Sequence, residues 1–171
     1  MPDFVFITDM LAPQNEIVRE FYVHHPSKAL KEIPEILKET WKLKGSKVFE
    51  DKIKWDIAAD PIDFFGQWRG RDVKDSYTTI WIKIRCLGKM AVQSKVGHIT
   101  VWIEGFMETK LPYKNIMDEA WKYIYLKLIY EQQLKDYLVE GKAKVLALDN
   151  KIREVFETWK AADEGEPRKT V

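Results

Sequence analysis

The chain has 171 residues, of which 46% are hydrophobic and 32% charged, a composition typical of a soluble globular domain. Its 28 basic and 27 acidic residues leave a net charge of +1, without the basic excess expected of a nucleic-acid-binding domain. No apolar run reaches the roughly 20 residues of a membrane-spanning helix, and no basic-then-apolar leader opens the chain. Abundant Lys and Glu with few Asn, Gln and Cys favour a heat-adapted cytoplasmic protein.

The first part of the chain combines strand and helix patterns. Residues 16–25 alternate in polarity, which predicts a strand, and Arg19 lies within an otherwise apolar face of it. Pro34 then interrupts a helical pattern, and proline suits the first turn of a helix better than its interior. We therefore predict two short helices over 27–32 and 34–44, and one kinked helix is the alternative.

The next sixty residues or so carry the patterns of antiparallel strands. Over residues 47–57, Asp51 falls on the same face as Phe49 and Trp55. Residues 64–71 place two glycines among bulky side chains, a feature of sharply curved or closely packed sheets. These patterns predict a curved sheet.

Two strand patterns between residues 76 and 108 predict a β-hairpin. Matching their apolar faces pairs Ile80 with Ile103 and places Trp81 across from Trp102 on the opposite face. A slip of one residue would turn the isoleucine row to the wrong side. One face is therefore branched aliphatic, and the other carries aromatic residues among charges, so that it is either covered or a contact surface.

A long helical run from Tyr113 to Lys160 follows, and its first half, Asn115 to Tyr137, is apolar over more than one stripe. We expect such a helix to be gripped by a curved partner. Gly141 predicts an end or a bend, after which residues 142–160 form a second amphipathic helix. The expected divisions are a domain over 1–140, an additional helix over 141–160 and a flexible tail over 161–171.

The order of these elements resembles the helix-grip fold of the START-related superfamily (SRPBCC), which includes birch-pollen-allergen-type proteins, polyketide cyclases and lipid-transfer domains. The resemblance covers about residues 14–140 and rests on the element order, the break at Pro34 and the final apolar helix. No residue motif supports it, so it assigns no functional residue. It implies an α+β fold, with a curved antiparallel sheet wrapped round the last helix and a cavity for an apolar ligand between them.

The sequence carries no catalytic, cofactor or metal signature. His24 and His25 are strand neighbours that point to opposite faces, so they do not readily chelate one metal together. Cys86 is the single cysteine, and its strand pattern predicts a buried, inert thiol. Arg69 and Arg71 share a strand face that could hold an anion, and a solvated face is the simpler interpretation.

Arg19 and Asp51 are the polar pair that we expect to give specificity. Each interrupts an apolar strand face, and the first strand of a helix-grip sheet neighbours the second, so the two could meet inside the cavity. Burial of an unpaired charge is costly, which favours pairing. A location of both groups at the rim fits the same pattern equally well.

We expect the protein to bind an apolar or amphipathic small molecule between the sheet and the long helix, driven by burial of apolar surface. The expected lining is Trp55, Trp68, Ile80, Ile82, Ile84, Ile99, Val101, Ile103, Trp121, Ile124 and Leu128, with Arg19 and Asp51 for specificity. A closed core built from the same apolar residues is the alternative. Two other functions stay open, namely a protein that forms a homodimer through the Trp81/Trp102 face or the 142–160 helix, and a cyclase- or hydrolase-like enzyme.

Overall fold

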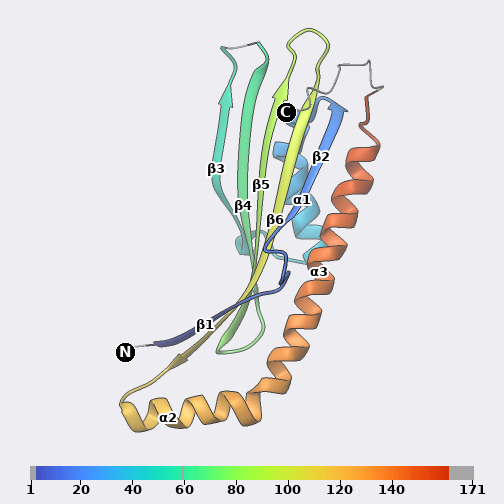
Figure 1. Ribbon diagram of the computed structural model, residues 1–171. Helices are drawn as coiled ribbons and strands as arrows, with labels where there is room; N and C mark the ends of the chain where they lie inside the picture. The colour runs from blue at the N-terminus through green and yellow to red at the C-terminus, as the bar shows by residue number, and fades with distance from the viewer. Residues whose placement is uncertain (1–2, 59, 162–171) are drawn as a thin grey trace.

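The computed structural model describes residues 3–58 and 60–161, and it shows an α+β fold in which a curved antiparallel sheet carries helices on one face (Figure 1). Within those residues the strands are β1 (Asp3–Asp9), β2 (Ile17–His24), β3 (Val48–Asp56), β4 (Ile62–Val73), β5 (Thr78–Met90) and β6 (Val96–Pro112). The first half of β6 pairs with β2 and its second half with β1, and on its other side the order continues β5, β4, β3. The predicted tail lies outside the described residues, except for Ala161.

The helical elements are η1 (Pro26–Lys28), α1 (Ala29–Trp41), η2 (Gly45–Lys47), α2 (Ile116–Tyr125), the π-helical η3 (Leu126–Tyr130) and α3 (Glu131–Glu157). We call the sheet face that α1 and α3 cover the inner face and the opposite one the outer face (Figure 1). None of the helices in the described part of the chain combines the length and the apolarity that crossing a membrane requires.

The inner face is a packed core. The alternating residues of β5 and β6 that were predicted to face inward are fully buried, namely Ile80, Ile82, Ile84, Ile99, Val101 and Ile103. The apolar stripe of α3 belongs to the same core cluster, with Val145, Leu148, Ile152 and Phe156 all fully buried. The second half of the long helical run therefore packs on the sheet of its own chain.

α1 is one helix with Pro34 inside it, so the prediction of two short helices divided at Pro34 is wrong. Proline costs about 3 kcal/mol in a helix interior. The apolar residues on both sides of Pro34, from Leu30 and Ile33 to Leu37 and Trp41, form one buried row. Burial of several large side chains outweighs the cost of a single proline.

Gly141 lies inside α3, so the predicted end or bend at this residue is also wrong. A Cβ atom on Gly141 would lie 2.2 Å from Sδ of Met10, and one on Gly105 of β6 would lie 2.8 Å from Cε of Met10. The two glycines thus make room for a buried methionine between α3 and β6. The long helix bends instead at η3 (Figure 1), and a π-helical turn is a common cause of a bend.

β5 and β6 form the predicted hairpin with the predicted faces, but in a different register. Ile84, and not Ile80, lies opposite Ile103, and Arg85 lies opposite Trp102. The difference arises because both strands extend further than expected, which leaves only residues 91–95 as the connection. A shift by four residues keeps every side chain on its predicted face, since the side-chain period of a strand is two.

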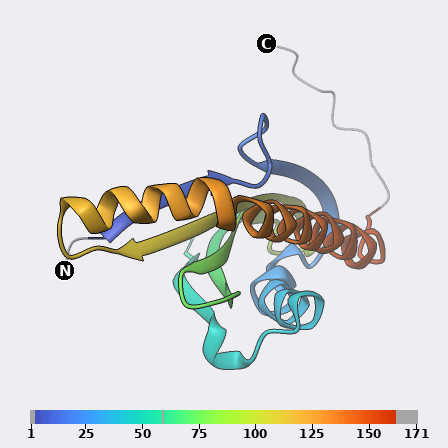
Figure 2. The ribbon, with the colours of Figure 1, turned by 90° about the horizontal axis from the view of Figure 1, so that it is seen from below.

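The second half of β6, β1 and α2 form an arm that extends away from α1 (Figure 2). Asn115 caps α2, because its Oδ1 accepts a hydrogen bond from the backbone N–H of Asp118 at 2.9 Å. α2 contacts β1 through Tyr123 and Phe4, whose ring centroids are 6.4 Å apart. The expectation that the first half of the long helix is gripped by the sheet is therefore wrong, and α3 takes that place.

Candidate functional site

An open groove of about 580 Å³ lies between α1 and the edge strand β3. Its apolar lining includes Leu30, Pro34, Ile53, Trp55 and Trp68. Charged side chains also line it, namely Lys31, Glu35, Lys38 and Glu50. The volume falls in the range of small-molecule sites, and apolar walls beside charged groups suit an amphipathic molecule.

A β-bulge decides which side chains of β3 face the groove. The pairing of β3 with β4 shifts between Glu50 and Lys52, so that Asp51 is the extra residue. Phe49, before the bulge, pairs with Arg69 on the outer face, whereas Trp55, after it, pairs with Phe64 on the inner face. The prediction that Phe49, Asp51 and Trp55 share one face is therefore wrong, because strict alternation does not hold across a bulge.

Trp68 of β4 is only 1% exposed, and its indole Nε1 has no hydrogen-bond partner within residues 3–58 and 60–161. Gly66 makes space for the ring, since a Cβ atom there would lie 2.2 Å from Cη2 of Trp68 and 2.8 Å from Cδ2 of Leu30. A buried N–H group without a partner costs about 1–3 kcal/mol, and buried tryptophans usually find one. Trp68 is thus an unused hydrogen-bond donor among the residues that line the groove.

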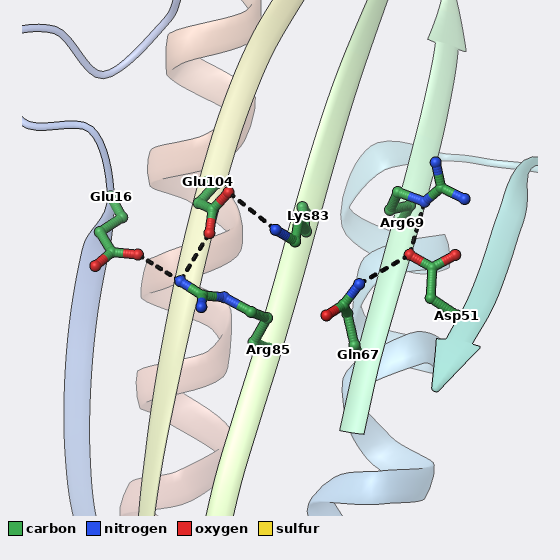
Figure 3. Close-up of polar contacts among 7 residues, drawn as sticks. All are labelled: Glu16, Asp51, Gln67, Arg69, Lys83, Arg85 and Glu104. Atoms are coloured by element: carbon green, nitrogen blue, oxygen red, sulfur yellow. Dashed lines mark hydrogen bonds and ion pairs between the residues drawn. The ribbon is translucent and has the colours of Figure 1, made fainter. Parts of the chain in front are cut away.

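The outer face of the sheet carries charges that are paired across strands (Figure 3). Asp51 accepts hydrogen bonds from Nε of Arg69 at 2.6 Å and from Nε2 of Gln67 at 3.2 Å. Burial works to raise the pKa of Asp51, but the hydrogen bonds from Arg69 and Gln67 outweigh it and hold the pKa below its ordinary value. The Asp51 side chain therefore lies on the outer face and does not line an interior cavity.

A second group of ion pairs lies beside the first on the same face (Figure 3). Nη2 of Arg85 lies 2.7 Å from Glu16 and 2.8 Å from Glu104, and Nζ of Lys83 lies 3.4 Å from Glu104. These contacts join β5 and β6 to the residue that precedes β2. Most of the charge in this part of the face is therefore neutralised within the chain.

The tryptophans of the outer face lie under arginine side chains. The guanidinium groups of Arg69 and Arg71 are 5.8 and 5.6 Å from the ring centroid of Trp81, and that of Arg85 is 5.5 Å from Trp102. Cation–π contacts of this kind stabilise the rings where they are. This aromatic face, predicted to be either covered or a contact surface, is thus partly covered by its own chain.

The structure separates the predicted lining residues into three places. Trp55 and Trp68 line the groove between α1 and β3. The six residues from β5 and β6, Ile80, Ile82, Ile84, Ile99, Val101 and Ile103, belong to the closed core. Trp121, Ile124 and Leu128 are exposed on α2 and η3, because the helix that covers the sheet is α3.

Arg19 and Asp51 are not brought together, so their predicted pairing is wrong. Nη2 of Arg19 lies 2.7 Å from Oδ2 of Asp149 in α3, whereas Asp51 pairs with Arg69. The reason is the strand order, since β2 pairs with β6 and three strands separate it from β3.

Cys86 is buried, as predicted, and burial raises the pKa of its thiol to about 12. In the described part of the chain, no group of three or more His, Cys, Asp or Glu side chains is arranged to hold a metal ion. The α1 side of the groove, formed by Leu30 and Pro34, was not predicted from the sequence. The sequence feature that could have indicated close packing at this place is Gly66 among bulky strand residues, because the glycine leaves room for Trp68 and Leu30.

No protein-family model matches the chain, and no curated protein matches it. One similar solved structure is a Staphylococcus aureus protein of unknown function, with a TM-score of 0.23 and 11% identity over 84% of this chain and 94% of that one. Another is a putative uncharacterized protein from Rhizobium leguminosarum, with a TM-score of 0.20 and 10% identity over 88% of this chain and 99% of that one. Similarities with TM-scores this low do not indicate a function.

Proposed function

We propose that the protein binds an apolar or amphipathic small molecule in the groove between α1 and β3. The observation that supports this most is the buried Nε1 of Trp68, which has no partner in the described part of the chain although Trp68 lines the groove. An apolar ligand would cover the exposed side chains of Ile53 and Trp55. Nε1 is buried in the free protein, so an oxygen atom of an amphipathic ligand would accept its hydrogen bond only after a neighbouring side chain of the groove moves aside.

Burial of apolar surface would drive binding. At about 25 cal/mol per Å², covering on the order of 300 Å² gives roughly 7 kcal/mol before the costs of association. Because association costs at least about 4 kcal/mol of this gain, apolar burial alone supports an affinity in the millimolar range or weaker. Glu35 and Lys38, which line the groove, lie 2.6 Å apart and pair with each other.

We further propose that the fold is a helix-grip of the START-related type. The curved antiparallel sheet and the long C-terminal helix on its inner face support this assignment. The proposed ligand site differs from the one that the resemblance implied, because α3 fills the space over β6 with Val145, Leu148 and Ile152. The groove lies instead on the same inner face, between α1 and the edge strand β3.

Native mass spectrometry tests the proposed function. Protein purified from its own host should carry a small molecule that denaturing extraction releases, and stripped protein should take up one dodecanoic acid per chain. Replacing Trp55 by Ala should weaken this uptake about tenfold. Trp121→Ala is the matched control, since Trp121 is also an exposed tryptophan but lies on α2. Equal uptake by wild type and Trp55→Ala would contradict the proposed site.

The alternative of an interaction protein requires a different surface from those predicted. The apolar stripe of residues 142–160 is buried against the sheet, and the Trp81/Trp102 face is partly covered by arginines. Another surface of the protein, on α2, has the properties of an interface and is independent of the groove.

A further inference from the structure

An exposed apolar stripe runs along α2 and η3. Met117, Trp121, Ile124 and Leu128 are 72%, 67%, 44% and 79% exposed. They follow one another at intervals of four, three and four residues, which places them on one side of a helix. Single exposed apolar residues are common on protein surfaces, but a contiguous row of four large ones marks an interaction site.

The opposite side of the same helix packs against other parts of its own chain. Leu126 and Tyr130 are buried, and Tyr123 packs edge-on against Phe4 of β1. The hydroxyl group of Tyr130 is hydrogen-bonded to Oγ1 of Thr78 at 2.8 Å. These contacts fix the rotation of the helix about its axis, so that the stripe points away from the sheet of its own chain.

We propose that α2 pairs with α2 of a second copy of this chain, stripe against stripe. Intervals of four and three residues are those of the a and d positions of a two-helix coiled coil, whose side chains fit between those of the facing helix. A twofold dimer requires a patch that is complementary to itself. A row of large apolar side chains without a charged member meets this requirement.

The stripe has the area that a small specific dimer needs. With the adjacent Tyr125, which is also exposed, its side chains present on the order of 600 Å² per copy, so a pair would bury about 1,200 Å² in total, the lower end for specific interfaces. α2 lies in the arm, beyond the part of the sheet that α1 covers (Figure 2). The stripe is therefore presented at one end of the molecule.

The charges around the stripe favour a protein partner over a membrane surface. From Tyr113 to Glu131 the three basic residues Lys114, Lys122 and Lys127 are balanced by the three acidic residues Asp118, Glu119 and Glu131. Helices that bind anionic membranes carry an excess of basic residues on their polar face. A helical segment that has no net charge and carries an apolar stripe is suited to pairing with the same segment of a second copy.

Sedimentation velocity on the full chain over a wide range of concentrations tests the proposal. The wild type should show a reversible monomer–dimer equilibrium. Leu128→Glu and Trp121→Lys should each raise the dissociation constant about tenfold or more, because each places charges within the apolar interface. Ile57→Glu is the matched control, since Ile57 is 74% exposed and follows β3, far from the arm, and this variant should dimerise like the wild type. Circular dichroism checks that all variants are folded.

Three results would overturn the proposal. The first is a wild-type chain that stays monomeric at every concentration, and the second is a dimer that both substitutions leave unchanged. The third is a monomer that co-sediments with vesicles of phosphatidylglycerol and phosphatidylcholine and loses this binding with Trp121→Lys, which would assign the stripe to a membrane surface. Trp55→Ala should leave dimerisation unchanged, so the result is separate from the proposed ligand site.

Discussion

Arg19 of β2 and Asp149 of α3 form a bidentate ion pair that ties the long helix to the sheet. Nε of Arg19 donates to Oδ1 of Asp149 at 2.8 Å and Nη2 donates to Oδ2 at 2.7 Å. The side chain of Asp149 is only 4% exposed. The hydrogen bonds to Asp149 outweigh the effect of burial and hold the pKa of Arg19 above its ordinary value.

Removal of Arg19 should destabilise the protein. Arg19→Met leaves the Asp149 carboxylate buried without its partner, and we expect a loss of roughly 2–3 kcal/mol, somewhat less than for a fully buried pair because Arg19 is partly exposed. The double variant Arg19→Met/Asp149→Leu should recover most of this loss, because no charge is left in the site. Urea unfolding measures both effects.

The matched control for this prediction is the exposed pair of Lys38 with Glu35. Lys38→Met should change the free energy of unfolding by less than about 1 kcal/mol. If Arg19→Met proves as mild as Lys38→Met, the ion pair with Asp149 does not hold α3 in the way that the structure indicates.

Gly141→Ala should destabilise α3 although alanine is the better helix former by about 1 kcal/mol. The added Cβ would lie 2.2 Å from Sδ of Met10, and overpacking of this kind costs roughly 1–3 kcal/mol. In a Met10→Ala background the same substitution should become stabilising. Thermal unfolding of the wild type and the three variants in this cycle gives the sign of each change, and stabilisation by Gly141→Ala alone would argue against the close contact.

Acid should weaken the contact between β4 and α3. Burial works to raise the pKa of Asp72, but hydrogen bonds from Lys144 and Lys74 outweigh it and hold the pKa below its ordinary value of 3.8. A hydrogen bond from Lys74 likewise lowers the pKa of Glu140 below 4.5. Because both pKa values are lower in the folded state, their contribution is present above the ordinary values and is lost as the pH falls below them.

Asp72→Asn should therefore lower the free energy of unfolding at pH 7 by about 1 kcal/mol and flatten its decrease below about pH 4. Urea unfolding at a series of pH values measures this slope. Glu154→Gln is the control, since Glu154 is exposed on α3 and should leave the slope unchanged. If the free energy of unfolding of Asp72→Asn fell with pH as steeply as that of the wild type, this result would count against the ion pairs of Asp72 with Lys74 and Lys144.

Periodicity was sufficient to predict the inner faces of β5 and β6, because burial on one face imposes strict alternation over many residues. It did not predict the bulge at Asp51. One extra residue places Phe49 and Trp55 on opposite faces of the sheet, and the composition of the strand gives no sign of it. The register of the hairpin depended on the length of its turn, which alternation does not determine.

The helical run shows why the predicted lining residues are not brought together. Both halves of the run are amphipathic, and the richer apolar pattern, around Trp121, lies on α2 and not on the helix that packs against the sheet. Leu128 is apolar yet exposed, so hydrophobicity alone did not distinguish a core face from the proposed interface. The pairing of Arg19 with Asp149, 130 residues apart, depends on the packing of α3 against β2, which no local pattern predicts.

The most direct test of the proposed ligand site is the indole N–H resonance of Trp68 in a ¹H–¹⁵N NMR spectrum, assigned with Trp68→Phe and recorded during a titration with dodecanoic acid. We expect this resonance to move downfield at saturation, because Nε1 would gain a hydrogen bond for which residues 3–58 and 60–161 offer no partner. The resonance of Trp121 on α2 should stay in place. A titration in which the fatty acid binds, the Trp68 resonance stays unchanged and that of another tryptophan moves would contradict the proposed ligand site.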